Sequence, residues 1–145
     1  MMKYITVFAV LVLVLASGCV TPSDKEGAEP ESAPVVKIGT LLPLTGDLAA
    51  YGGPMEDGAR LAIKEVNENG GVLGGDIKLV TKDSQTTGVA AVDAMNQLVT
   101  LEKVPAVIGA AGSGVSLAVI DIAVNNHIIQ ISPSNTAPDF TTYPD

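Results

Sequence analysis

The sequence predicts an α/β fold with a doubly wound parallel sheet. From Val35 onward, short runs of β-branched residues alternate with longer segments of helical periodicity. Glycine or proline punctuates most of the boundaries between these segments. Because a strand–helix–strand crossover makes successive strands parallel, the alternation places helices on both faces of one sheet.

The first strand is expected over residues 35–44, "VVKIGTLLPL", and it ends near Pro43. A helix should follow over residues 53–69 and stop at Gly70-Gly71, since glycine is the usual residue after a helix. Its apolar face at helical spacing consists of Met55, Ala59, Ala62 and Val66.

The second strand, residues 76–82, alternates apolar and polar side chains, which indicates an edge position with one wet face. The second helix is expected over residues 87–103, before Pro105. Its apolar face should comprise Ala91, Ala94, Met95, Leu98 and Leu101.

A third, fully buried strand is predicted over residues 105–109, and a fourth over residues 128–132. Between them, residues 113–126 predict a helix that is apolar almost all round, so it should be deeply covered or meet a partner surface. The remaining "PSNTAPDFTTYPD" predicts an irregular tail, and the domain is expected to be the front half of a larger one.

The N-terminus predicts an export signal over residues 1–18. Lys3 precedes an apolar run, residues 5–16, that is shorter than the ~20 residues needed to span a bilayer. The only cysteine, Cys19, directly follows Ala16-Ser17-Gly18, which is the arrangement of a lipoprotein signal. We therefore expect Cys19 to carry a lipid; an ordinary secretory signal with an incidental cysteine is the alternative.

Residues 19–34 are rich in Pro, Glu, Ser and Ala, and they predict a disordered tether before the domain of residues 35–145. The formal net charge is -8, from 16 acidic and 8 basic residues. The chain has no basic cluster, which argues against nucleic acid as a partner.

The loops after the predicted strands are small, hydroxyl-bearing and poor in charge. They contain residues 45–47, 83–84, 110–113 and 132–136. Ligands of open parallel sheets bind at the carboxyl ends of the strands, and a helix N-terminus there favours an anionic group. Ser113 is expected to be the N-cap of the third helix.

The stretch "AAGSGVSLA", residues 110–118, permits three other interpretations, and each fails. Leu117 stands where a dinucleotide loop needs its third glycine, and no lysine follows Lys103 to serve a mononucleotide loop. Ser116 and His127 are eleven residues apart on one helix, roughly 16 Å, too far for a nucleophile and its base. His127 is better placed as a polar residue of the last helical turn. One histidine, one cysteine expected to carry a lipid, and no cluster of carboxylates at ligand spacing argue against a metal site. We therefore expect that this chain is not an enzyme.

Three stretches carry a family resemblance: "IGTLLPLTGDLAAYGGPMEDGARLAIKEVNENGG", "VPAVIGAAGSGVSLAVIDIAV" and "IIQISPSNTAPDFT". They resemble the type I periplasmic binding proteins, specifically the receptors for branched-chain amino acids. In that family two α/β lobes close over a small ligand. The resemblance therefore implies that residues 35–145 are an incomplete first lobe, which alone would bind ligand weakly or not at all.

The resemblance also assigns the site residues. Ser113 would give its hydroxyl and amide to the ligand carboxylate, Ser134 its backbone atoms, and Thr136 its hydroxyl and amide. The ring of Tyr51 would pack against the ligand side chain. No cofactor and no metal are implied. This sequence departs from the pattern at Gly112, where some members have a disulfide cysteine, and in "SPSNT", where small residues are common.

The implied function is an extracytoplasmic solute-binding component of an ABC importer, lipid-anchored at the outer face of the cell membrane. Its ligand would be a branched-chain or other amino acid, or a similar small carboxylate or amide compound, and its partners a membrane permease and an ATPase. The alternative is a ligand-sensing domain of a receptor-like protein. The sequence does not select one ligand.

Overall fold

The computed structural model describes residues 33–144. The predicted signal, Cys19 and all but the end of the predicted tether lie outside the described residues. Four parallel strands form one sheet in the order β2-β1-β3-β4. The strands are β1 (Val36–Leu42), β2 (Ile77–Asp83), β3 (Ala106–Gly109) and β4 (Ile129–Ile131). The predicted fold class is confirmed.

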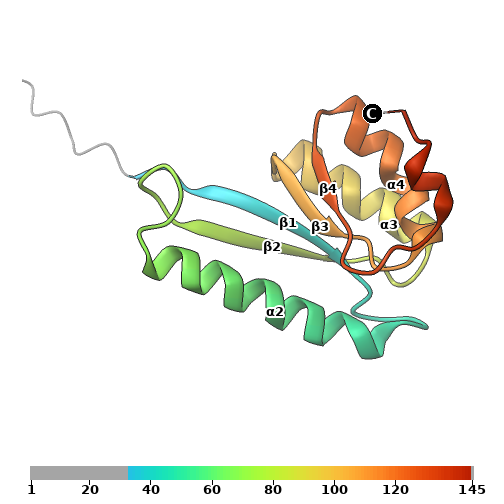
Figure 1. Cartoon of the computed structure of the whole chain (residues 1–145), viewed down its shortest axis with the longest axis horizontal. Coiled ribbons are helices and arrows are strands. Elements are labelled where there is room, and N and C mark those ends of the chain that lie inside the picture. The colour runs from blue at the N-terminus through green and yellow to red at the C-terminus, as the bar shows by residue number, and fades with distance from the viewer. Residues whose placement is uncertain (1–32, 145) are drawn as a thin grey trace, which may run out of the picture. The chain divides into compact units, whose positions relative to one another are not determined.

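Helices lie on both faces of this sheet (Figure 1). The long helix α2 (Ala49–Glu68) runs along β1 and β2. On the opposite face lie α3 (Gly88–Asn96), its π-helical extension η1 (Gln97–Leu101), and α4 (Ser113–Asn125). A short 3-10 helix, η2 (Pro138–Thr141), forms in the tail. None of the helices within residues 33–144 combines the length and apolarity needed to cross a membrane.

The hydrophobic core lies between the sheet and the α3–α4 layer. Leu41 and Val107 project from the two central strands into this layer, where they meet α3, η1 and α4. The fully buried helical side chains that complete it include Met95, Leu98 and Val119. The predicted core residues Ala91 and Ala94 are also buried, so the predicted face of the second helix is confirmed up to Leu98.

Leu101, the last residue predicted for that face, is instead 72% exposed. The helix changes to π-helical winding at Gln97. A π turn contains more residues than an α turn, so it rotates the residues after it away from the direction that α-periodicity predicts. The helix also ends at Leu101 instead of Lys103.

Helix α2 differs from its prediction in start and in orientation. It begins at Ala49, four residues before the predicted Gly53. Ala62 and Val66, which were predicted to face the core, are exposed. Polar groups contribute to the contact of the helix with β2: Asn67 exchanges two hydrogen bonds with the backbone of Ile77, at 2.9 and 2.8 Å. Because α2 covers only β1 and β2, part of its apolar stripe lies beside the sheet instead of over it.

The same limited coverage corrects the prediction of a fully buried third strand. β3 is central in the sheet, but Ala106 and Ile108 are only half-buried. Beside them, Ile129 and Ile131 of the edge strand β4 are each 63% exposed. The predicted edge position of β2 is confirmed.

Helix α4 is covered on one side and not all round. Val115, Val119 and Ala123 are buried and belong to the core, whereas Ala118 is exposed. The helix ends at Asn125, so His127 is not in its last turn as predicted. His127 lies beyond the helix in the left-handed region, with a φ of 56°.

Candidate functional site

The carboxyl ends of β1 and β3 form the topological switch point of the sheet. From β1 the chain continues to β2 on one side, and from β2 it returns to β3 on the other. Loops that leave such a point diverge and create a crevice, which is where open α/β sheets bind ligands. Two of the predicted site residues, Ser134 and Thr136, lie in the loop after β4, whereas Tyr51 and Ser113 lie in the first turns of α2 and α4, which follow the loops after β1 and β3.

A hollow of about 260 Å³ lies at this edge of the sheet. Its lining combines residues from the start of α2 with residues from the loops after β3 and β4: Leu48, Tyr51, Met55, Ala111 and Ser134. The structure therefore brings two of the predicted residues, Tyr51 and Ser134, into one cavity. Tyr51 is 59% exposed, so its ring is free to contact a ligand.

The other two predicted residues contact each other. The backbone N–H of Thr136 donates to the Ser113 hydroxyl at 3.2 Å. Ser113 is the first residue of α4, and the N-cap is Gly112, so the prediction of Ser113 as N-cap is wrong. Because its oxygen accepts from Thr136, the Ser113 hydroxyl keeps its own proton to donate. The first N–H groups of a helix also lack partners within the helix.

Three serine hydroxyls fix the loops around these residues. Ser134 donates to the carbonyl of Ala111 at 2.6 Å, and Ser132 donates to the carbonyl of Ala110 at 2.6 Å. Ser116, which is fully buried, donates to the same Ala110 carbonyl at 2.9 Å. These hydrogen bonds hold the loops after β3 and β4 together and give Ser116 a structural role.

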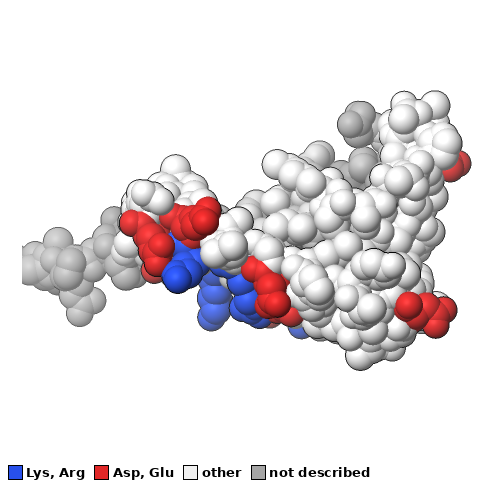
Figure 2. All heavy atoms as spheres, turned by 60° about the horizontal axis from the view of Figure 1, so that its bottom comes forward, with Lys and Arg blue, Asp and Glu red and all other residues white. Residues whose placement is uncertain are grey.

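Charge is absent from the lining of the hollow. The Lys and Arg side chains visible in Figure 2 gather in one part of the surface. Within residues 33–144, the Lys and Arg residues lie on β1, β2 and α2, except Lys103, which lies just after η1. Neutral donors and the partial positive charge of the α4 N-terminus are thus the groups available to an anion at this site. The described part of the chain contains no group of three or more potential metal ligands.

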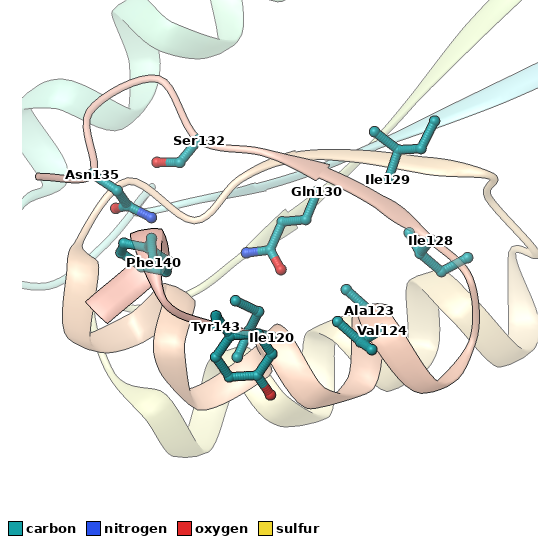
Figure 3. A pocket seen from close by; sticks show the side chains of 10 residues that line it. All are labelled: Ile120, Ala123, Val124, Ile128, Ile129, Gln130, Ser132, Asn135, Phe140 and Tyr143. Carbon is teal, nitrogen blue, oxygen red and sulfur yellow. The ribbon is translucent and has the colours of Figure 1, made fainter. Parts of the chain in front are cut away.

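A larger hollow of about 520 Å³ lies between α4, β4 and the tail (Figure 3). Apolar side chains, including Ile120, Val124 and Phe140, form much of its lining. The amide oxygens of Gln130 and Asn135 are buried there without a hydrogen-bond partner. Of the two residues that depart from the family pattern in "SPSNT", Asn135 lines this hollow and Ser134 lines the candidate site.

Sequence reasoning missed Leu48, Met55 and Ala111 as lining residues. Met55 was assigned to the core-facing stripe of its helix, yet it lies four residues after Tyr51. Residues four apart share one face of a helix, and this spacing was the signal that could have identified it. Leu48 and Ala111 carry no such signal, because loops place them.

Asp83, at the end of β2, is a charged group with a lowered pKa. Burial by itself would raise the pKa of its carboxyl group. Hydrogen bonds from the Thr45 hydroxyl and from the backbone N–H groups of Gln85, Thr45 and Leu44 outweigh that effect and lower the pKa below 3.8. Asp83 is therefore a carboxylate at neutral pH.

With this geometry in view, comparison with known proteins identifies the family. The family model described as periplasmic binding protein matches residues 35–145. A Leu/Ile/Val-binding protein of Rhizobium johnstonii is 37% identical over 106 residues, which are 73% of this chain and 29% of that protein. A Leu/Ile/Val-binding protein homologue of Brucella melitensis is 33% identical over 106 residues, covering 73% of this chain and 28% of that protein.

Solved structures agree. The branched-chain amino acid transporter substrate-binding protein of Streptococcus pneumoniae, in complex with isoleucine, matches with a TM-score of 0.72 and 38% identity over 75% of this chain and 31% of that one. An ABC transporter substrate-binding protein of Desulfitobacterium hafniense, in complex with Leu, matches with a TM-score of 0.65 and 28% identity over 76% of this chain and 32% of that one. The chain thus spans less than a third of these relatives. It belongs to the periplasmic binding protein family and corresponds to the N-terminal part of a type I member like those that bind branched-chain amino acids.

Proposed function

We propose that this chain belongs to an extracytoplasmic solute-binding component of an ABC importer, and that its ligand is an amino acid with an apolar side chain. Its family and the names of its relatives support this proposal. Two related structures contain isoleucine or leucine. Capture by such a protein is non-covalent.

The observation that carries the proposal is the division of the candidate site into a polar and an apolar part. Ser113 and Thr136 meet at the N-terminus of α4. Leu48, Tyr51 and Met55 form an apolar wall on the α2 side of the hollow. An amino acid has the same two parts, a carboxylate and a side chain.

Each site residue then has a defined role. The Ser113 hydroxyl and the free N–H groups of α4 would hold the carboxylate, since hydrogen bonds to a charged acceptor are the strong ones. Thr136 would add its hydroxyl, and Ser134 its backbone groups. Leu48, Tyr51 and Met55 would cover the ligand side chain.

Titration with L-leucine, followed by two-dimensional NMR of the ¹⁵N-labelled full chain, tests this proposal. NMR detects the weak binding expected of a single lobe. The amide resonances of Ser113, Gly114 and Thr136 should shift with leucine. Leucinamide, which keeps the side chain and the ammonium group but lacks the carboxylate, should shift them far less. Equal shifts with both compounds would show that the site does not read a carboxylate.

Ser113→Ala should weaken leucine binding by about two- to tenfold, the effect of one lost hydrogen bond. Thr100→Ala is the matched control, because it also removes one hydroxyl, on η1, and this hydroxyl donates only to the Asn96 carbonyl. Affinity of the control variant should equal that of the wild type. Loss of affinity in both variants would point to a general effect on the fold.

We also propose that Cys19 anchors the mature protein to the membrane through a lipid. The full chain expressed in its own host should then fractionate with membranes and carry the added mass of acyl groups on Cys19. Cys19→Ala should lose that mass and move to the soluble fraction. A variant that remains with the membranes like the wild type would refute the anchor.

An importer requires a permease and an ATPase in the membrane, which we propose as the partners of this protein. Deletion of the gene should reduce uptake of radiolabelled leucine by cells, and the wild-type gene should restore it. The parent cells must be shown to make the protein. If deletion of the gene then leaves their leucine uptake unchanged, the importer role is contradicted.

A further inference from the structure

Two side chains, Asp83 at the end of β2 and Thr86 in the loop that follows it, connect the loop after β2 to the loop after β1. The Asp83 carboxylate accepts hydrogen bonds from the N–H groups of Leu44 (2.9 Å) and Gln85 (2.8 Å). It also accepts from the N–H and the hydroxyl of Thr45, at 3.2 and 2.6 Å. Thr86 completes the connection: its hydroxyl accepts from the Leu48 N–H and donates to the Thr45 carbonyl, both at 3.1 Å. We call Asp83 and Thr86 the loop clamp.

The loop that the clamp holds leads directly into the apolar wall of the candidate site. Leu48 is the N-cap residue of α2, and no side chain caps the helix there. Tyr51 lies one turn further on. Both line the hollow, whereas Asp83 and Thr86 do not.

No apolar side chain of α2 is fully buried. Gly52 is the only fully buried residue in the helix. A Cβ at Gly52 would lie 2.1 Å from the Pro43 carbonyl oxygen, so the helix start and the loop are in direct backbone contact. The loop conformation therefore sets where Leu48 and Tyr51 stand.

The loop after β1 lies in close backbone contact with the loop after β2, beside the clamp. Gly46 has a φ of +84°, and a Cβ there would lie 2.4 Å from the Gln85 carbonyl oxygen. The loops after β1 and β2 thus touch at Gly46, and the hydrogen bonds of the clamp lie on both sides of this contact.

We infer that Asp83 and Thr86 are positioning residues for ligand binding: they set ligand affinity by holding Leu48 and Tyr51 in place, without touching the ligand. This inference rests on the proposed function, because it assumes that the hollow binds an apolar amino acid. A carboxylate suits the Asp83 position, since it offers only acceptors to its four donors.

Substitutions at Thr86 separate the hydroxyl from the rest of the side chain. Thr86→Val keeps the shape and removes the hydroxyl, whereas Thr86→Ser keeps the hydroxyl. Thr86→Val should weaken L-leucine binding to the full chain by about two- to tenfold, the effect expected for one or two hydrogen bonds. Thr86→Ser should restore affinity to near the wild-type value.

Asn67→Ala is the matched control. Like Thr86→Val, it removes two hydrogen bonds. These two bonds hold the opposite end of α2 against β2. Its leucine affinity should equal that of the wild type even though the protein is less stable. If Asn67→Ala weakens leucine binding as much as Thr86→Val does, stability and not positioning explains the effect, and the inference is overturned.

Amide hydrogen exchange provides a measurement without ligand. In Thr86→Val the N–H of Leu48 loses its acceptor, so exchange at Leu48 and in the following turn should accelerate, while exchange in the C-terminal half of α2 should not. Unchanged exchange at Leu48 would overturn the inference. If the wild type fails to bind leucine, the proposed function fails, and the exchange result still decides whether the clamp positions the loop.

Discussion

The C-terminus of α4 allows one stability prediction to be worked out closely. Asn126 caps the helix, and the next residue, His127, has a φ of 56°. The His127 N–H donates to the Val124 carbonyl at 3.1 Å, and the Ile128 N–H donates to the Ala123 carbonyl at 2.9 Å. These two hydrogen bonds form a Schellman motif, in which glycine is the usual residue at the position of His127.

His127→Gly should therefore stabilise the protein. An L-residue in the left-handed region costs about 1–2 kcal/mol, and glycine avoids this cost. The greater freedom of glycine in the unfolded chain takes back about 0.4–1 kcal/mol. Taken at the middle of each range, these values give a net gain in the free energy of unfolding of about 0.8 kcal/mol. This corresponds to a rise in Tm of about 2–5 °C for a domain of this size.

Urea and thermal unfolding of the full chain, followed by circular dichroism, measure this gain. His127→Ala is the control, because it removes the imidazole but keeps the Cβ that causes the backbone strain. If the backbone dominates, the glycine variant should be more stable than both the alanine variant and the wild type. A glycine variant no more stable than the alanine variant would refute the reasoning. A loss of stability in both would instead favour an attractive contact between the imidazole and the helix end.

Three further predictions concern the core, the pH dependence and the sheet edge. Leu98→Ala should lower the free energy of unfolding by about 2–5 kcal/mol, because Leu98 is fully buried. Leu101→Ala removes a side chain that is 72% exposed and should change the free energy of unfolding by less than about 0.5 kcal/mol. Urea unfolding of the two variants compares these effects. The folded-state pKa values of Asp83 and Glu56 are lowered, in Glu56 chiefly by the hydrogen bond from the Thr81 hydroxyl. The two carboxylates therefore stabilise the fold fully above their unfolded pKa values of 3.8 and 4.5. This stabilisation is lost as the pH falls through the lower folded-state pKa values. Unfolding measured from pH 6 to pH 2 should show this loss in the wild type and less of it in Asp83→Asn. We expect the exposed apolar edge strand β4 to promote self-association of the chain. Ile131→Lys places a charge there, so sedimentation velocity should show fewer oligomers than for the wild type; an unchanged distribution would contradict this expectation.

Much of the fold was predictable because local periodicity reflects local burial. The order of strands and helices, the edge position of β2 and the buried face of α3 all follow from residues a few positions apart in the chain. The errors arise where burial depends on distant segments. Ala62, Val66 and Ile108 are apolar and lie at the spacing expected for a buried face. Because α2 covers only β1 and β2, Ala62 and Val66 are exposed and Ile108 is only half-buried.

The candidate site shows the same division. The family resemblance singled out Ser113, Ser134, Thr136 and Tyr51, and the structure places them at one edge of the sheet. Their roles in binding remain predictions. Met55 was predicted as core and lines the hollow instead, because the start and rotation of α2 differ from those that periodicity gave.

By itself the sequence determined the class of fold and the chemical character of the strand-end loops, because hydrophobic period and loop composition are local properties of the chain. The tertiary structure alone decided which loops meet, where α2 begins, and that Asp83 and Thr86 hydrogen-bond to the loop that leads into α2. Those features depend on hydrogen bonds between residues 22 to 41 positions apart. Such contacts form only when the parallel strands pair, so no local pattern records them.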